Sequence, residues 1–277
     1  MADCADKLAA YTLAPRVTLD AWNPTQYHRF ADARLRPAVD LLAQISREAP
    51  ASVFDLGCGS GRTTGLLAKR WPKARIVGVD SSARMLEAAS KDHPDIEFIE
   101  ADLAAWAPDW PADVLFSNAA LHWLDDHPAL FSRLFAQVRP GGTFAVQMPR
   151  NHDQPSHTAI VAAAGAGPWA ERLKPLLRPS PVALPADYHA IISPQASALN
   201  IWETTYLQVL EGENPVAEWT KGTALGPLLS ALEPDQRSAF ESAYRSLILS
   251  SYPPQADGST LFPFRRLFIV AERAVDG

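Results

Sequence analysis

The chain has 277 residues, enough to bury a large hydrophobic core, and we expect one domain with insertions rather than two independent domains. Its net charge of -6 argues against a nucleic-acid-binding protein, which normally presents a basic face, and no stretch approaches the roughly 20 apolar residues of a membrane span. Cys4 and Cys58 form no disulfide framework and the N-terminus lacks the features of a signal peptide, which together predict a cytoplasmic protein.

The first half of the chain alternates between predicted strands and helices. Residues 1–21 carry no strong pattern, and we interpret them as a leader that precedes a single domain over residues 22–277. In residues 34–45, apolar side chains recur at helical spacing. The segments predicted next are strand 52–56, helix 62–71, strand 75–80, helix 82–92, strand 96–100, strand 113–117, helix 127–138, a turn at 139–142 and strand 143–148. This alternation is typical of an α/β fold whose parallel sheet is covered on both faces.

Beyond Pro149 the pattern changes. Residues 165–195 contain many prolines and few periodic apolar positions, so we expect an irregular cap segment there. A strand over 199–209 comes next, and the segments after it are helices near 214–221, 226–232 and 235–251 and a strand over 264–271. Helices between the last two strands cannot lie under the sheet without breaking the alternation. We therefore expect helical lid insertions at about 150–198 and 210–262, over the strand ends where a cofactor would bind.

A glycine-rich turn follows the first predicted strand. That strand ends in Asp55 and Leu56, and three glycines then occupy alternate positions: Gly57, Gly59 and Gly61. A buried strand that turns sharply into a helix leaves unpaired backbone N–H groups, and glycine lets a ligand approach them closely. Glycine also serves ordinary tight turns, so the motif alone leaves a purely structural role open. We interpret it as a nucleotide-cofactor pocket at the carboxyl end of the strand.

Further acids follow the next two predicted strands. Asp80 comes about 20 residues after Gly57, where an acid can accept hydrogen bonds from ribose hydroxyls. Asp102 follows the third strand and can accept from an adenine amino group. Each acid alone could cap a helix, but acids at three successive strand ends are hard to explain by capping. The GxGxG spacing, with Asp55 two residues before it, resembles the S-adenosylmethionine (SAM) site of class I methyltransferases.

Segments along most of the chain resemble one family within that superfamily. They are residues 22–27, 34–38, 55–59, 147–149, 201–206 and 266–270, and together they resemble trans-aconitate methyltransferases. The resemblance implies a Rossmann-like class I methyltransferase domain, with a seven-stranded, mostly parallel sheet and an antiparallel last strand. It also implies formation of the monomethyl ester of trans-aconitate, or of a closely related small polycarboxylic acid, with SAM as the methyl donor.

The resemblance further implies a set of cofactor-binding residues. The glycine motif would line the methionine and ribose portion of SAM through Asp55, Gly57, Cys58, Gly59 and Gly61. The remaining positions are Asp80 for the ribose hydroxyls, Ser81 and Met85 around the adenine, Asp102 and Leu103 at the adenine edge, Asn118 for the methionine amino group, Tyr27 closing over the cofactor and Arg36 at its carboxyl end. The structural alternatives are core packing for Tyr27 and a surface salt bridge for Arg36.

Methylation of a carboxylate calls for positioning rather than proton transfer. A carboxylate is already ionised at neutral pH, so no general base is expected. We assign the catalytic role, substrate orientation, to His122 and to Trp123, whose indole N–H can donate to the reacting carboxylate. Arg150 and Arg266 are candidates for binding the distal carboxylates, because arginine holds carboxylates well. Strand alternation places Arg265 on the opposite face, so it is left out. Core packing of Trp123 and surface positions for the arginines are the alternatives.

Three departures from the family pattern concern the substrate more than the reaction class. His122 precedes Trp123 where the family usually has glutamine, Gly226 stands where it often has arginine, and Arg150 and Arg265 are additional arginines. A methyltransferase of another small carboxylic acid or secondary metabolite is therefore an alternative. A non-catalytic SAM-binding protein is a second, and a nicotinamide-dependent oxidoreductase is a third, although its glycine spacing would differ.

The expected partners are small molecules. We expect a carboxylic acid substrate, no nucleic acid, no membrane, and a monomer or weak homo-oligomer. No His/Cys cluster has zinc-ligand spacing, and the neighbouring His152 and His157 have no further ligand near them in the sequence, so no metal site is predicted.

Overall fold

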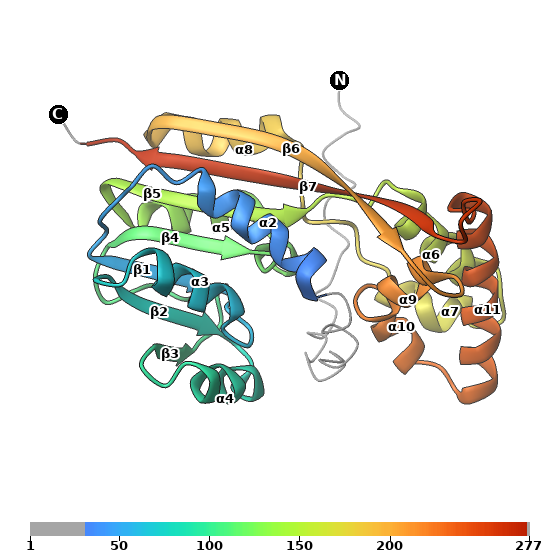
Figure 1. The fold of residues 1–277 in the computed structure, drawn as a ribbon. Coiled ribbons are helices and arrows are strands. Elements are labelled where there is room, and N and C mark those ends of the chain that lie inside the picture. The colour runs from blue at the N-terminus through green and yellow to red at the C-terminus, as the bar shows by residue number, and fades with distance from the viewer. Residues whose placement is uncertain (1–30, 276–277) are drawn as a thin grey trace, which may run out of the picture.

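A seven-stranded sheet lies at the centre of the protein (Figure 1). The structure is a computed structural model, and it describes residues 31–275. The strands are β1 (Ser52–Leu56), β2 (Arg75–Asp80), β3 (Glu97–Glu100), β4 (Ala112–Asn118), β5 (Val138–Pro149), β6 (Ala196–Leu210) and β7 (Thr260–Arg273), in the order β3-β2-β1-β4-β5-β7-β6. The first five strands are parallel, and β7 is antiparallel to both of its neighbours. This confirms the predicted fold class.

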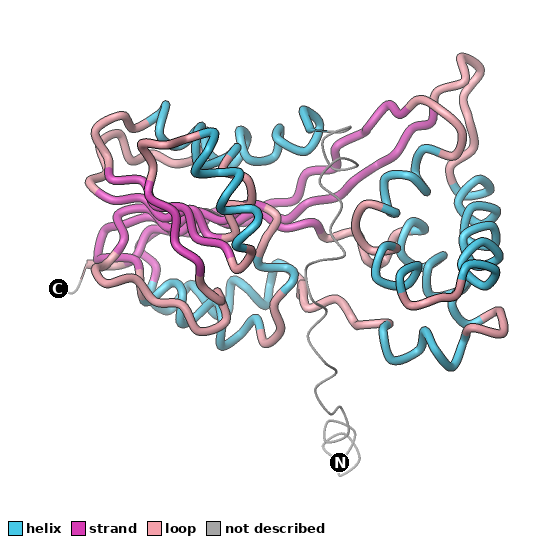
Figure 2. Tube along the Cα trace, turned by 90° about the horizontal axis from the view of Figure 1, so that it is seen from below, coloured by secondary structure: helices cyan, strands magenta, loops and turns pink. Residues whose placement is uncertain are grey.

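Helices cover both faces of the sheet, as Figure 2 shows in its left half. Side chains of a strand alternate between the faces, so Val53 of β1 joins one apolar cluster and its neighbour Phe54 joins another. The helices beside the sheet are α2 (Ala31–Ala43) and α3 (Arg62–Arg70) on the Val53 side, α5 (His127–Ala136) and α8 (Pro185–Ile192) on the Phe54 side, and α4 (Ala83–Asp92) next to β3. Within the described residues, no helix has the length and apolar character needed to cross a lipid bilayer.

A second group of helices, here called the helical cap, lies beyond the carboxyl ends of the parallel strands (Figure 1). Its members are α6 (Pro155–Gly165), α7 (Ala170–Leu173), α9 (Pro215–Lys221), α10 (Gly226–Ser230) and α11 (Pro234–Ser251). The cap has its own apolar core, in which Trp169 and Phe240 lie 5.7 Å apart between ring centroids. Phe262 and Phe264 belong to this core as well, so the extended β6 and β7 join the cap to the sheet.

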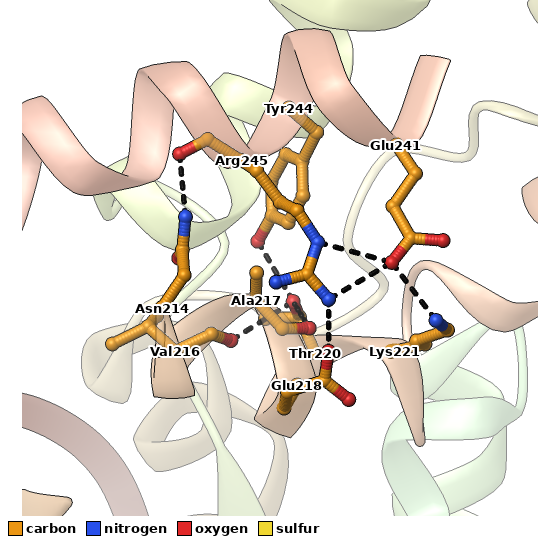
Figure 3. A network of polar contacts seen from close by, with 9 residues as sticks. All are labelled: Asn214, Val216, Ala217, Glu218, Thr220, Lys221, Glu241, Tyr244 and Arg245. Carbon is orange, nitrogen blue, oxygen red and sulfur yellow. Dashed lines mark hydrogen bonds and ion pairs between the residues drawn. The ribbon is translucent and has the colours of Figure 1, made fainter. Parts of the chain in front are cut away.

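Polar contacts fix α9 against α11 inside the cap (Figure 3). Arg245 of α11 donates to Glu241 at 2.9 Å and also to Glu218 of α9. The hydroxyl groups of Tyr244 and Thr220 lie 2.8 Å apart, and Tyr244 donates to the backbone carbonyl of Ser156 at 2.9 Å. These bonds hold α9, and with it Thr220, in a defined position relative to the rest of the cap.

The structure differs from the sequence-based expectation in two places. Residues 165–195 are not irregular, because they contain α7, the 3-10 helices η3 (Lys174–Leu176) and η4 (Ser193–Gln195), and α8. Moreover, α8 packs on α5 under the sheet, where Tyr188 and His127 form a 2.5 Å hydrogen bond, and is no part of the cap. The predicted turn at 139–142 is an irregularity within β5, where the register shifts and Gly141 has a φ of 71°.

Candidate active site

The glycine turn joins β1 to α3 at the carboxyl edge of the sheet. Its three glycines have positive φ values, 72° at Gly57, 55° at Gly59 and 78° at Gly61. Residues that carry a side chain rarely adopt this backbone conformation. The Gly57 N–H donates to the Val79 carbonyl of β2 at 2.7 Å. A methyl group on Gly57 would lie 2.1 Å from the Cβ atom of Ala120, whereas one on Gly59 would meet nothing within 4 Å. Gly57 is therefore required for packing, and Gly59 leaves open space in front of the backbone.

Asp80 ties this turn to the end of β2. One oxygen of its carboxyl group accepts from the Gly59 N–H at 2.9 Å, and the other accepts from the Ser82 N–H at 3.0 Å. Each carboxylate oxygen has two lone pairs, so both can also accept from a ligand hydroxyl. Ser82 caps α4 by accepting from the Met85 N–H, and Ser81 beside it is exposed. The structure thus brings Asp80, Ser81 and Met85 together on one side of the glycine turn.

Asp55 lies buried at the end of β1, underneath the turn. Its carboxyl group accepts a 2.7 Å hydrogen bond from the hydroxyl of Thr64 on α3. The pKa of Asp55 is raised to about 7, chiefly by burial and to a smaller extent by the nearby charge of Asp80, while the hydrogen bond from Thr64 acts in the opposite direction. Asp55 is therefore a structural anchor of the turn, and its carboxyl group ionises at a higher pH than an exposed aspartate does.

Asp55→Asn is expected to stabilise the cofactor-free protein at alkaline pH. Because the folded-state pKa of Asp55 is raised, the protonated carboxyl group contributes fully to the stability of the fold at about pH 4 and below. This contribution is lost as the pH rises through about 7, since ionisation of Asp55 then favours the unfolded state. The loss amounts to roughly 4 kcal/mol when integrated over that interval. Asparagine keeps an acceptor for Thr64 and does not titrate, so the variant's advantage in urea unfolding should grow with pH. A constant difference between the two proteins from acid to alkaline pH would contradict this prediction.

Asp102, Leu103 and Asn118 complete the predicted cofactor side. Asp102 follows β3, and its carboxyl group accepts from the Ala104 N–H at 2.9 Å. The Leu103 side chain is buried next to Gly57, and its carbonyl accepts from Arg133 at 2.7 Å. Asn118 ends β4, and its side-chain oxygen is buried without a hydrogen-bond partner among the described residues. A buried acceptor that lacks a hydrogen-bond partner can accept a hydrogen bond from the amino group of a ligand.

The remaining predicted cofactor residues are Tyr27, Arg36 and Cys58. Tyr27 lies outside the described residues. Arg36 lies 5.2 Å above the ring of Tyr206 and 3.8 Å from Asp40, on the α2 side of the sheet, which is the surface salt bridge considered as the alternative. Cys58 is a buried free thiol whose pKa is raised strongly by burial, so it is no nucleophile.

A cavity of about 210 Å³ lies between the sheet edge and the helical cap. A cavity of about 150 Å³ already holds benzene, so this volume suits a small organic molecule. The lining residues with polar or aromatic side chains are His122, Trp123, Asp125, Asn151, His152, His157, Arg178, Trp219, Thr220, Thr223, Phe264 and Arg266. Among the described residues, no group of three or more His, Cys, Asp or Glu side chains could hold a metal ion.

His122 and Trp123 reach this cavity from the 3-10 helix η2 (Leu121–Trp123), which follows β4. The preceding Ala119 has a φ of 55°, rare for a residue with a side chain, and this turn starts the path from β4 into η2. The rings of His122 and Trp123 lie 4.6 Å apart between centroids, and the Trp123 side chain is half exposed. Burial lowers the pKa of His122 well below its usual value, so its imidazole is neutral.

Among the described residues, two arginines line the cavity, Arg266 and Arg178. Arg266 on β7 is buried, donates to the side-chain oxygen of Gln147 at 3.2 Å and lies 4.6 Å over the ring of Phe264. Arg178 belongs to the segment between η3 and α8, 3.8 Å from Asp125. Sequence reasoning missed Arg178, because the surrounding prolines hide any periodic pattern that would have placed it.

The structure does not bring the predicted substrate-binding residue Arg150 into the cavity. Its guanidinium donates to Glu203 of β6 at 2.7 Å, and its backbone carbonyl accepts from Arg265 at 2.8 Å. Arg265 also pairs with Asp153. The placement of Arg265 away from the cavity agrees with strand alternation, whereas Arg150 lies beyond the end of β5, where alternation gives no guidance.

Two solved structures with low sequence identity share the fold of this chain. The YcgJ protein from Bacillus subtilis matches 87% of this chain and 100% of its own at a TM-score of 0.57 and 15% identity. A phosphoethanolamine N-methyltransferase from Haemonchus contortus, solved with S-adenosylhomocysteine, matches 95% of this chain and 61% of its own at a TM-score of 0.56 and 15% identity. A methyltransferase domain family model matches residues 53–142. Fold, glycine turn and strand-end acids define a class I SAM-dependent methyltransferase.

Curated relatives narrow the class to one family. The trans-aconitate 2-methyltransferase from Azoarcus sp. (strain BH72) is 47% identical over 255 residues, which cover 92% of this chain and 100% of the relative. The protein of the same name from Rhodopseudomonas palustris (strain BisB18) is 45% identical over 90% of this chain and 98% of its own. The chain belongs to the trans-aconitate 2-methyltransferase family.

Proposed function

We propose that the protein transfers the methyl group of SAM to one carboxylate of trans-aconitate and releases the monomethyl ester. The observation that carries this proposal is the cavity between η2 and the helical cap. It lies next to the segment that packs on Gly57, and both Arg178 and Arg266 line it. A small, multiply charged anion matches both the volume and the sign of this lining.

The residues present beside the glycine turn fit SAM. The open space in front of Gly59, the remaining lone pairs of Asp80 and the unpaired side-chain oxygen of Asn118 suit a methionine and ribose portion with hydroxyl and amino donors. Asp102 and Leu103 would then contact the adenine. When bound, SAM supplies a methyl group on a positively charged sulfur atom.

Methyl transfer needs alignment and little else from the protein. The ionised carboxylate forms an O–C bond to the methyl carbon while the C–S bond breaks and its electron pair remains on sulfur, so no proton moves. Holding the reacting atoms in line can supply roughly 7–11 kcal/mol of the barrier. His122 and Trp123 would orient the reacting carboxylate, and their position on η2, at the lining of the cavity, supports this role. The neutral His122 acts as a hydrogen-bonding partner and not as a base.

The two arginines would hold the carboxylates that do not react. Arg266 comes from the sheet and Arg178 from the segment after η3, so a bound acid bridges the two parts of the molecule. A hydrogen bond to a charged group contributes about 1.5–3 kcal/mol. The aromatic rings of Trp219 and Phe264 form apolar walls that keep water from the reacting atoms.

The proposed cellular setting and assembly follow the sequence-based expectations. The protein would act in the cytoplasm as a monomer or weak homo-oligomer, with residues 22–277 as one domain and the stretch before them as a leader.

Product identification tests the proposed function. The protein is incubated with SAM and, separately, with trans-aconitate, other tricarboxylic acids, dicarboxylic acids and a monocarboxylic acid, and the products are identified by mass spectrometry. We expect the monomethyl ester of trans-aconitate to form with the highest kcat/KM. If a different acid were esterified faster, that acid and not trans-aconitate would be the preferred substrate. SAM binding without turnover on any acid would favour a non-catalytic SAM-binding protein.

A further inference from the structure

Two histidines with no part in the alignment of the reacting atoms line the acceptor cavity. His152 lies in the turn before α6 and His157 lies within α6, and their ring centroids are 4.8 Å apart. Nδ1 of His157 lies 3.1 Å from the hydroxyl oxygen of Ser156. Nδ1 of His152 is buried and has no hydrogen-bond partner among the described residues. An unsatisfied buried nitrogen beside a cavity is an unusual feature that a bound polar group could explain.

The described lining of the cavity carries too little positive charge for a tricarboxylate. The charged side chains among its described lining residues are Arg178, Arg266 and Asp125, so with neutral imidazoles the lining has one net positive charge. Trans-aconitate brings three negative charges at neutral pH. Buried charges that lack a partner are costly, so a further cation beside the bound acid would stabilise the complex.

Both imidazoles are neutral in the free protein. Burial lowers the pKa of His157 to about 3, and it lowers the pKa of His152 to a smaller extent. The other titratable groups that face the pair are His122 and Asp125 from the η2 side, Asp153 beside His152, Arg178 from the segment after η3 and Arg266 from β7. His152 is therefore the member of the pair that takes up a proton from solvent most readily when an anion binds beside it.

We propose that His152 and His157 form a carboxylate-binding pair that takes up one proton from solvent when the polycarboxylic acid binds. The proton resides mainly on His152, and the two rings share only one because two imidazolium ions at this distance repel each other. A carboxylate within about 4–6 Å raises the pKa of a histidine by about 1 to 3, and the substrate brings several. Methylation removes one of these charges, so the proton is returned to solvent more readily from the product complex.

This inference rests on the proposed function, and calorimetry tests it separately. The protein saturated with S-adenosylhomocysteine is titrated with trans-aconitate near neutral pH, in phosphate and in Tris, which differ widely in ionisation enthalpy. The difference between the two binding heats gives the number of protons exchanged, and we expect an uptake of about one proton per bound acid. Equal heats in the two buffers would overturn the inference and leave the proposed function intact.

His152→Gln identifies the group that takes up the proton. The variant should bind trans-aconitate without proton uptake. In the wild-type protein we expect the KM for trans-aconitate to rise about tenfold per pH unit above neutral pH, and in the variant we expect no such rise. His189→Gln, at an exposed histidine of α8, is the matched control and should behave like the wild-type protein. An unchanged melting temperature and S-adenosylhomocysteine affinity verify the fold of both variants. Undiminished proton uptake in His152→Gln would refute the assignment. Absence of any binding heat and of any ester would refute the proposed function itself.

Discussion

Gly57→Ala is expected to abolish methyl transfer and to destabilise the protein even without a cofactor. The added methyl group would lie 2.1 Å from the Cβ atom of Ala120, and the φ of 72° at this position strains any residue with a side chain. The left-handed conformation costs about 1–2 kcal/mol and overpacking costs a further 1–3 kcal/mol, which gives a loss of about 3 kcal/mol. Ala120 directly precedes η2, so relief of the clash displaces His122 and Trp123 from the cavity. Thermal unfolding and steady-state kinetics with trans-aconitate measure the two effects.

Gly59→Ala is the matched control for this prediction. Its φ of 55° imposes a similar backbone strain, but the new methyl group meets nothing within 4 Å. We therefore expect a loss of only about 1–2 kcal/mol in the cofactor-free protein, together with weaker SAM binding, because the methyl group enters the open space in front of the turn. Equal destabilisation by the two substitutions would show that the contact with Ala120 contributes nothing.

Arg266→Met is expected to lower kcat/KM for trans-aconitate by about 100-fold or more, since two hydrogen bonds to a carboxylate contribute roughly 3 kcal/mol or more. Methionine keeps much of the apolar contact with Phe264 but removes the charge and the bond to Gln147. SAM affinity should change little, because Arg266 lines the acceptor cavity. Arg266→Lys should recover part of the activity, since it restores the charge but not the paired hydrogen bonds.

Arg150→Met is the control at the arginine that the structure places outside the cavity. Its guanidinium pairs with Glu203, and an ion pair near the surface contributes about 0–1 kcal/mol. We expect kcat/KM within about threefold of wild type and a small loss of stability. If Arg150→Met lowered kcat/KM as far as Arg266→Met does, the proposal that the distal carboxylates of the substrate bind in the cavity would be wrong.

The first half of the fold could be predicted because its signals are local. Apolar runs, glycines and strand-end acids repeat at short spacing, and they correctly predicted the strands from Ser52 to Asp80 and the turn at Gly57. The seven-stranded, mostly parallel sheet and its antiparallel last strand were predicted from the family resemblance and are confirmed.

The later half could not be read in the same way, because its contacts join residues far apart in the sequence. Tyr188 of α8 is buried through its contact with His127 of α5, and nothing within residues 165–195 marks that partner. Likewise, Arg150 and Arg178 look equivalent as sequence positions. Only the pairing of Arg150 with Glu203 and the path of the chain after η3 separate the arginine that faces the cavity from the one that does not.

The extension of β6 and β7 beyond the sheet has a consequence for how such enzymes diversify. The residues proposed for the methyl donor precede β5, whereas most of the described lining of the proposed acceptor cavity, apart from η2, follows β5 or lies between the two long strands. The two recognition tasks are thus encoded in separate stretches of one gene product. Mutations in the later stretch can alter which acid is accepted while the machinery for the donor stays as it is.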